Sequence, residues 1–164
     1  MSVTEFVNDH TYTGQQYRFV VLPKKAIPFL HLGEPYIAIS VSDSFDECPV
    51  VPQDENCKAV LQLVFDDIDE QIGNMALMTK DHARRIVGFV KEHSEVQTIV
   101  CQCSSGMSRS AGICVALMHW LEGYEDKRIR ENHCPNDFVA RMIIEAVAED
   151  EMPESKSVSA SSTE

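Results

Sequence analysis

The sequence predicts an α/β protein, in the form of a three-layer α/β/α sandwich around a largely parallel central sheet. Runs rich in β-branched residues alternate along the chain with segments of helical periodicity, which is typical of such sheets. The chain has 164 residues, enough for one domain with a sizeable core. One loop of unusual composition lies between a predicted strand and a predicted helix, at the sheet edge where ligands bind in this class.

The first half of the chain contains three predicted strands. The run 17–22 is apolar and is followed by a proline, and a short helix is expected at 24–30. A richer β-type run at 35–41 predicts a central strand. A polar loop at 42–57 separates that strand from a third one at 60–65.

The second half begins with an acidic loop at 66–78 and continues with helices around one further strand. Apolar residues recur at helical spacing in 79–93, which also begins with residues able to cap a helix. The strand 98–103 leads through the unusual loop into a central helix at 110–124. A short charged helix or turn is expected at 126–132.

The two ends of the chain set the predicted domain. Residues 1–16 are polar and irregular. The final helix opens at Pro135, because proline is favourable in a first helical turn. We expect a single domain over 1–149 and a disordered acidic, serine-rich tail over 150–164, since the tail has no apolar period.

The most informative motif is the loop between the strand at 98–103 and the central helix. In it a cysteine and an arginine bracket five small or flexible residues, and a serine follows: Cys103, Ser104, Ser105, Gly106, Met107, Ser108, Arg109 and Ser110. Backbone N–H groups of such a loop, together with the helix N-terminus, can bind an anion. The same surroundings favour the thiolate form of a cysteine, and the arginine offers a planar fork to two phosphate oxygens. The motif therefore predicts phosphoryl transfer onto sulfur.

This run resembles the Cys-x5-Arg-Ser/Thr signature of cysteine-based protein tyrosine phosphatases. The short chain and the Ser-Arg-Ser ending look like the compact dual-specificity branch of bacterial and phage type, and the resemblance covers about 17–148. One position departs from the pattern, because the family usually has histidine before the nucleophile and this chain has Gln102. Glutamine can donate hydrogen bonds from behind the loop, but it carries no charge.

The resemblance implies roles for several residues. Cys103 would be the nucleophile that forms a phosphocysteine, and the amides of 104–109 with Arg109 would bind the phosphate. Ser110 would hydrogen-bond the sulfur and help it to leave. The general acid would lie in the acidic loop, where Asp67 aligns best, Asp66 is the main alternative and Asp69 a weaker one. Asn136 would brace the phosphate loop from behind.

Composition narrows the classes of molecule that the protein could bind. The formal net charge is −12, so nucleic acid and anionic membranes are disfavoured. The cysteine count of six is even, but the chain is too large and too regular to need a disulfide framework. No apolar segment opens the sequence, so we expect a cytoplasmic protein. The implied chemistry needs no cofactor. A metal site from Cys101, Cys103 and His93 is disfavoured, because no second ligand pair has the spacing of a zinc site.

The phosphate loop itself indicates the substrate class. None of its five central residues is basic, which fits a phosphate monoester better than a polyanion. We therefore expect a phosphorylated protein as substrate, with phosphotyrosine first. The dual-specificity resemblance implies a shallow pocket, which would also admit phosphoserine or phosphothreonine. The alternatives are a phosphate-binding pseudophosphatase, a phosphatase of inositol polyphosphates and a rhodanese-like sulfurtransferase. The oligomeric state is not predicted.

Overall fold

A computed structural model of the protein describes residues 2–152, so most of the predicted tail lies outside the described residues. The strands are β1 (Thr11–Thr13), β2 (Arg18–Pro23), β3 (Tyr36–Ser42), β4 (Cys57–Val64) and β5 (Thr98–Cys103). The helices are α1 (Val3–Asp9), the 3-10 helix η1 (Lys24–Phe29), α2 (Lys80–Glu92), α3 (Arg109–Leu121), α4 (Arg128–Asn132) and α5 (Asp137–Asp150). No helix within 2–152 combines the length and the apolar character needed to cross a bilayer.

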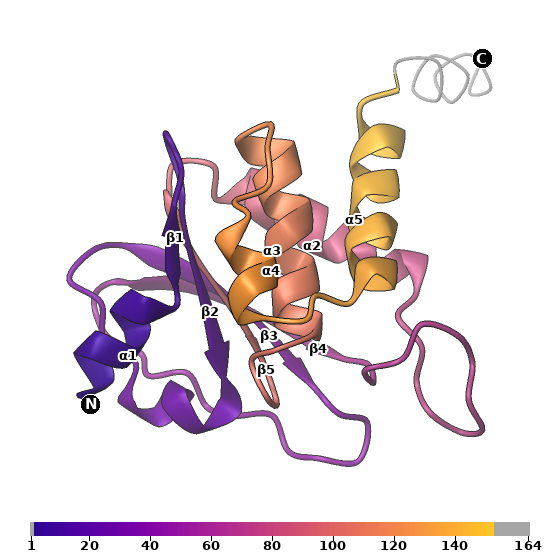
Figure 1. The fold of residues 1–164 in the computed structure, drawn as a ribbon, viewed down its shortest axis with the longest axis horizontal. Coiled ribbons are helices and arrows are strands. Elements are labelled where there is room, and N and C mark those ends of the chain that lie inside the picture. Colours follow the sequence, from indigo (N-terminus) through magenta and orange to yellow (C-terminus); the bar gives the residue numbers. More distant parts are fainter. Residues whose placement is uncertain (1, 153–164) are drawn as a thin grey trace, which may run out of the picture.

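The strands form one sheet in the order β1-β2-β5-β3-β4. Only β1 runs antiparallel to its neighbour, and the other pairs are parallel, as predicted. The strand β5 is central, with Thr98 opposite Arg18 of β2 on one side and Tyr36 of β3 on the other. The chain leaving β5 therefore emerges in the middle of the carboxyl edge of the sheet, as Figure 1 shows.

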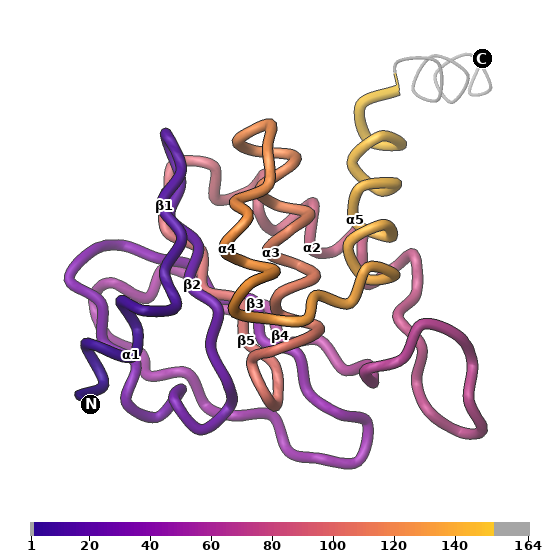
Figure 2. Tube along the Cα trace, viewed as in Figure 1, coloured from indigo at the N-terminus to yellow at the C-terminus, as the bar shows by residue number. Residues whose placement is uncertain are grey.

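Helices cover both faces of this sheet, which confirms the predicted sandwich. The helices α2, α3 and α5 share one apolar core with one face of the sheet. The other face packs against α1, η1 and the loop before β4, in a second and smaller core. In the trace of Figure 2, the amino-terminal segment and the later helices accordingly lie on different sides of the strands. The second outer layer is thin, because it consists of short segments rather than long helices.

Alternation along β5 decides which side chains reach each core. Ile99, Cys101 and Cys103 face the core beneath α3, while Val100 faces the smaller core. Gln102 alternates with Cys103 and is 1% exposed. All six residues of β5 are buried, since the strand has neighbours on both sides and layers on both faces.

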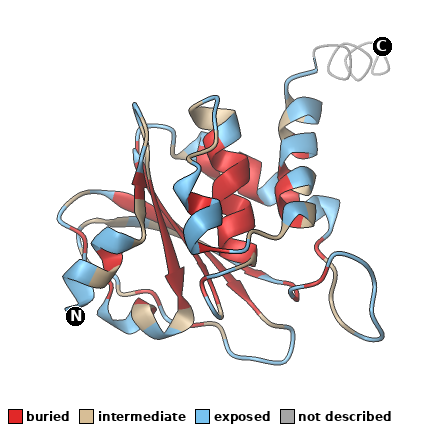
Figure 3. Ribbon diagram, viewed as in Figure 1, coloured by how far each residue is buried: buried red, intermediate tan, exposed pale blue. Residues whose placement is uncertain are grey.

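The helix α3 is the most enclosed helix of the described chain. Its residues 109–118 are all buried, and Figure 3 shows them in red between the neighbouring elements. Its contact with the start of α5 is close, because a Cβ added at Gly112 would lie 2.5 Å from the backbone oxygen of Asn136. Glycine at this position therefore allows the α5 segment to reach the loop that precedes α3.

The amino-terminal segment is more regular than the prediction of an irregular 1–16. Ser2 caps α1, and Glu5 completes a capping box with it. The strand β1 then pairs with β2, and the turn between them is held by one carboxylate. Glu122 accepts hydrogen bonds from the backbone N–H groups of Gln15, Gln16 and Tyr17, at 2.8, 2.8 and 2.7 Å.

The close approach at Gly112 makes a testable prediction. Gly112→Ala should lower the free energy of unfolding by about 1–2 kcal/mol, because displacing the Asn136 backbone costs more than the ~1 kcal/mol gained in helix propensity. Gly88→Ala in α2 is the matched control, since a Cβ there meets nothing within 4 Å and should stabilise the protein. Urea unfolding of both variants measures the difference, and a Gly112→Ala protein as stable as Gly88→Ala would contradict the packing argument.

Candidate active site

The phosphate loop, residues 104–108, joins the end of β5 to the start of α3 and packs against the end of β2. Gly106 has φ +70°, and a Cβ on it would lie 2.5 Å from the backbone nitrogen of Pro23. Both facts require glycine at this position. The backbone N–H of Lys24 donates to the carbonyl of Ser104 at 3.1 Å, so the loop is fixed to its neighbour at both places.

The candidate nucleophile lies at the mouth of this loop. Cys103 is 1% exposed and its Sγ lies 3.1 Å from Oγ of Ser110, which is fully buried in the first turn of α3. The structure thus places the predicted serine against the sulfur. A hydroxyl in this position can donate a hydrogen bond to a thiolate.

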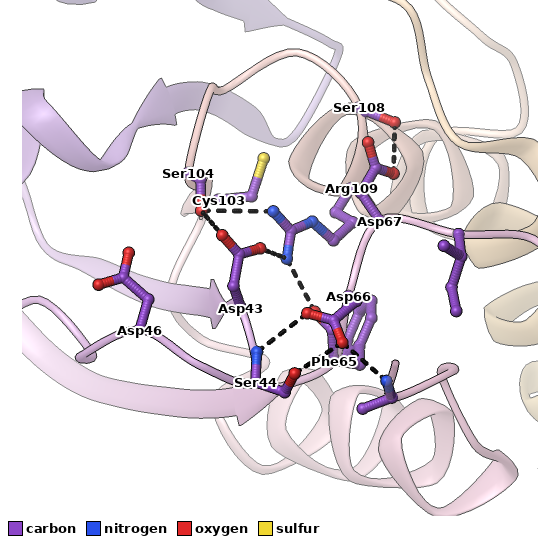
Figure 4. A network of polar contacts seen from close by, with 12 residues as sticks. Asp43, Ser44, Asp46, Phe65, Asp66, Asp67, Cys103, Ser104, Ser108 and Arg109 are labelled. Carbon is purple, nitrogen blue, oxygen red and sulfur yellow. Dashed lines mark hydrogen bonds and ion pairs between the residues drawn. The ribbon is translucent and has the colours of Figure 1, made fainter. Parts of the chain in front are cut away.

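The two terminal nitrogens of the Arg109 guanidinium hold this side chain in place. Its Nη1 donates to the carbonyl oxygen of Phe65 at 2.8 Å and forms an ion pair with Oδ1 of Asp43 at 2.8 Å. Its Nη2 lies 3.4 Å from Oγ of Ser104. Its Nε is buried and has no hydrogen-bond partner among residues 2–152. Figure 4 shows this network around Arg109 and Cys103.

Asp43 is a site residue that the sequence interpretation missed. It follows β3, and its second oxygen accepts a hydrogen bond from the hydroxyl of Ser104 at 3.1 Å. One carboxylate therefore fixes both the arginine and the first residue of the phosphate loop. The signal was its place in the chain, because the carboxyl ends of neighbouring parallel strands meet at one sheet edge.

The two adjacent carboxylates of the acidic loop have different surroundings. Asp66 is 2% exposed, and it accepts from the Ser44 amide at 3.0 Å, the Ser44 hydroxyl at 2.7 Å and the Ala76 amide at 2.7 Å. Burial raises the pKa of this carboxyl, yet the hydrogen bonds from Ser44 and Ala76 outweigh it and hold the pKa below its usual value. Asp66 is therefore a fixed anion that joins two loops.

Asp67 is exposed and turns toward the phosphate loop. Its Oδ1 accepts from the hydroxyl of Ser108 at 2.8 Å and from Nδ2 of Asn136 at 2.9 Å. The geometry thus brings Asp67, and not Asp66, into contact with the loop that carries Cys103. Asp67 also keeps one carboxylate oxygen with no hydrogen bond to the residues in 2–152.

Asn136 connects the start of α5 to both loops. Its side-chain oxygen caps α5 by accepting from the Val139 amide at 3.2 Å, and its Nδ2 also donates to the carbonyl of Ile68 at 3.2 Å. Its backbone N–H donates to the carbonyl of Ser108 at 2.9 Å. The resemblance implied that Asn136 braces the phosphate loop. In the structure its backbone contacts that loop, and its side chain holds Asp67.

Gln102 lies behind the nucleophile, on the opposite face of β5. Its Oε1 accepts a short hydrogen bond from the hydroxyl of Ser40 in β3, and its Nε2 has no partner among the described residues. It therefore joins the two central strands just before the phosphate loop begins.

His133 supports the phosphate loop from below and was not singled out from the sequence. It is 3% exposed, and its Nδ1–H donates to the carbonyl of Gly106 at 2.9 Å. Its Nε2 lies 2.9 Å from the hydroxyl oxygen of Tyr12, so both ring nitrogens have a polar partner. Burial lowers the pKa of His133, against an opposing effect of the Gly106 carbonyl, and the nearby His10 lowers it further.

Comparisons with known proteins identify the fold. No protein-family profile matches the sequence, and no curated protein matches it. Solved structures do match, among them the human tyrosine phosphatase-like serine/threonine/tyrosine-interacting protein, with TM-score 0.55 and 16% identity over 82% of this chain and 93% of that one. A mouse putative dual specificity phosphatase complexed with zinc tungstate matches with TM-score 0.54 and 15% identity, over 83% of this chain and 84% of that one. PTPMT1 in complex with PI(5)P matches with TM-score 0.54 and 14% identity, over 86% and 96%.

These likenesses show a dual-specificity phosphatase-like fold. The resemblance seen in the run from Cys103 to Ser110 is thereby confirmed at the level of the fold. No group of three or more His, Cys, Asp or Glu side chains able to hold a metal ion occurs within 2–152.

The ion pair at Arg109 makes a prediction. Asp43→Asn should lower the free energy of unfolding by about 1.5–3 kcal/mol, the usual loss for a hydrogen bond to a charged group. Added phosphate should restore more stability to this variant than to the wild type, because the dianion supplies the counter-charge that Arg109 has lost. Thermal unfolding with and without phosphate measures both effects, and an equal phosphate-induced shift in the two proteins would contradict it.

The buried His133 makes a pH-dependent prediction. Its pKa is lower in the folded than in the unfolded chain, so its stabilisation is complete above the unfolded value of 6.5 and is lost as the pH falls through the folded value. The free energy of unfolding should therefore decline below about pH 6.5, near the ordinary histidine pKa. His133→Asn keeps a donor near Nδ1 and cannot titrate, so its decline should be shallower. Denaturant unfolding at several pH values checks this, and an unchanged slope would count against it.

Proposed function

We propose that this protein is a cysteine-dependent phosphatase that hydrolyses phosphotyrosine, and phosphoserine or phosphothreonine as well, through a phosphocysteine intermediate. The observation that carries the proposal is the Nε of Arg109, which is buried, charged and without a partner next to the loop of Cys103. A buried guanidinium edge of this kind is costly unless an anion completes it. A phosphate group held by the loop amides would do so.

In the first step, the thiolate of Cys103 attacks phosphorus and a P–S bond forms while the bond from phosphorus to the leaving oxygen breaks. The charge on the equatorial oxygens is met by the backbone amides of the loop and by Arg109. The leaving oxygen takes a proton from Asp67, whose carboxylate accepts a hydrogen bond from Ser108 of the phosphate loop.

In the second step, water attacks the phosphocysteine and gives its proton to the Asp67 carboxylate. The P–S bond breaks, inorganic phosphate forms and the sulfur leaves as a thiolate. The hydroxyl of Ser110, 3.1 Å from the sulfur, can hydrogen-bond that leaving thiolate. The proton balance is closed, because Asp67 gives one proton in the first step and regains one in the second.

The charge around Arg109 supports a phosphate monoester as substrate. Residues 104–108 contain no basic side chain, and Asp43 pairs with the arginine itself. An inositol polyphosphate carries several dianionic groups and would need more cations than this site presents. Phosphorylated protein is therefore the favoured substrate class, although PTPMT1 of similar fold was solved with the lipid PI(5)P.

A phosphate-binding pseudophosphatase is the second candidate. Gln102 favours it, because an uncharged residue stands where the resembling family usually has histidine. One protein of similar fold is itself described as tyrosine phosphatase-like. Turnover of a phosphate ester by the wild-type protein separates the two candidates. We further infer a cytoplasmic setting, supported by six cysteines that are all free thiols.

The nucleophile is tested by Cys103→Ser. This variant should lose p-nitrophenyl phosphate hydrolysis by at least about a thousandfold, because serine is a far weaker nucleophile at neutral pH. Inorganic phosphate should still bind, since the amides and Arg109 are unchanged. Cys134→Ser is the control, because that thiol is exposed and outside the loop. Cys103→Ser activity within tenfold of the wild type would overturn the mechanism, and a wild type that binds phosphate without turnover would favour the pseudophosphatase.

The general acid is tested by comparing neighbouring variants. Asp67→Asn should slow hydrolysis of phosphotyrosine peptides by roughly 10²–10⁴-fold, the usual contribution of a general acid. The loss should shrink for aryl esters whose leaving group needs no proton. Asp66→Asn should mainly destabilise the fold, because Asp66 holds Ser44 and Ala76. If leaving-group dependence appeared in Asp66→Asn and not in Asp67→Asn, the assignment would be wrong.

A further inference from the structure

A groove of about 920 Å³ opens directly beside the phosphate loop, on its β2 side. One wall is η1 with the residue before it, the other wall is the loop between β3 and β4, and the phosphate loop forms one end. The residues that line the groove include Pro23, Lys25, Pro28, Pro49, Val50 and Ser105. Because the groove and the candidate active site share the phosphate loop, a chain bound at Cys103 can extend into this groove.

The groove is fixed in shape by contacts across and behind it. The backbone of Lys24 donates to Ser104 at 3.1 Å, which joins η1 to the phosphate loop. The Nζ of Lys24 lies 3.0 Å from a carboxylate oxygen of Asp46 and so ties the two walls together. Nε2 of Gln62 donates to the carbonyl of Pro49 at 2.8 Å and anchors the second wall to β4. Prolines in both walls stiffen them further.

The groove offers one free positive charge and an apolar wall. Asp46 pairs with Lys24, which leaves Lys25 exposed and without an ion-pair partner in residues 2–152. Val50 is 82% exposed, and it adds to the apolar surface of the prolines. Lys25 and this apolar wall thus lie together in a chain whose net charge is −12.

The groove on the opposite side of the phosphate loop carries negative rather than positive charge. This second groove, of about 510 Å³, is lined by Asp67, Asp69 and Asp137 and by Arg141. Asp137 pairs with Arg130 at 2.9 Å, which leaves two carboxylates against one cation. Figure 4 shows Asp46, at the first groove, and Asp67 on different sides of Cys103. An acidic segment is therefore repelled from the second side and directed to the groove at Lys25.

We propose that the groove at Lys25 binds the flank of a phosphopeptide substrate, and that it selects a flank that combines acidic and apolar residues. This inference rests on the proposed phosphatase activity and specifies its substrate class. The carboxylate of the flank pairs with Lys25, and the apolar side chain packs on Pro28 and Val50. The contact is exposed, so it contributes a preference rather than most of the affinity.

The test uses phosphotyrosine peptides that differ in one three-residue flank, Glu-Val-Glu, Lys-Val-Lys or Ser-Gly-Ser. Each flank is placed either before or after the phosphotyrosine. On one of these two sides, Glu-Val-Glu should raise kcat/KM about two- to fivefold over Ser-Gly-Ser, the range expected for exposed ion pairs. Lys-Val-Lys on that side should lower it. The preference should shrink as salt is raised, because the charges are exposed to solvent.

Variants assign the preference to the groove. Lys25→Glu should reverse it and leave p-nitrophenyl phosphate hydrolysis unchanged, since that ester has no flank. Val50→Ser should weaken it for the Glu-Val-Glu peptide. Lys58→Glu is the matched control. Lys58 is an exposed lysine at the start of β4, whereas the groove lies by the carboxyl ends of the strands. This control should behave like the wild type.

The outcomes separate the two proposals. Turnover of all peptides at equal kcat/KM, or a preference that survives Lys25→Glu, would overturn the groove assignment and leave the phosphatase intact. A wild type that hydrolyses neither peptide nor p-nitrophenyl phosphate would overturn both. A flank preference lost in Lys25→Glu and kept in Lys58→Glu would support the groove.

Discussion

The need to pair one buried charge organises the carboxyl edge of this sheet. Arg109 is 4% exposed, and an unpaired guanidinium at that depth would cost several kcal/mol. Its partners come from the ends of two other strands, Asp43 after β3 and the carbonyl of Phe65 after β4. The arginine itself follows β5. The parallel order β5-β3-β4 brings these three ends to one edge, so the sheet topology and the anion site depend on each other.

Much of this arrangement could be predicted from local patterns. The strand, glycine-containing loop and helix around Cys103 are encoded by residues next to each other in the chain, and the structure has them at the predicted place. The choice between Asp66 and Asp67 is different. The two are adjacent and chemically equal. Only the amides of Ser44, in the loop after β3, and of Ala76, further along the acidic loop, make Asp66 a buried anchor.

The missed residues have one property in common, which is that their partners are remote in the sequence. His133 supports the carbonyl of Gly106, and Asp43 reaches Arg109 across the sheet edge. Residue type and periodicity carry no information about such pairs. The amino-terminal helix was a different error, because Ser2 and Glu5 form a capping box whose spacing is visible in the sequence.

The attachment of Asp67 to the phosphate loop determines when these two loops become ordered relative to each other. Through Ser108 and Asn136, the carboxylate is already joined to the anion cradle before any substrate arrives. The conformational entropy of assembling these parts is therefore lost once, as the chain folds, rather than at each encounter with a substrate. Under the proposed mechanism, a small ester with little surface of its own would meet a site that is already ordered, because its binding leaves no loops to order.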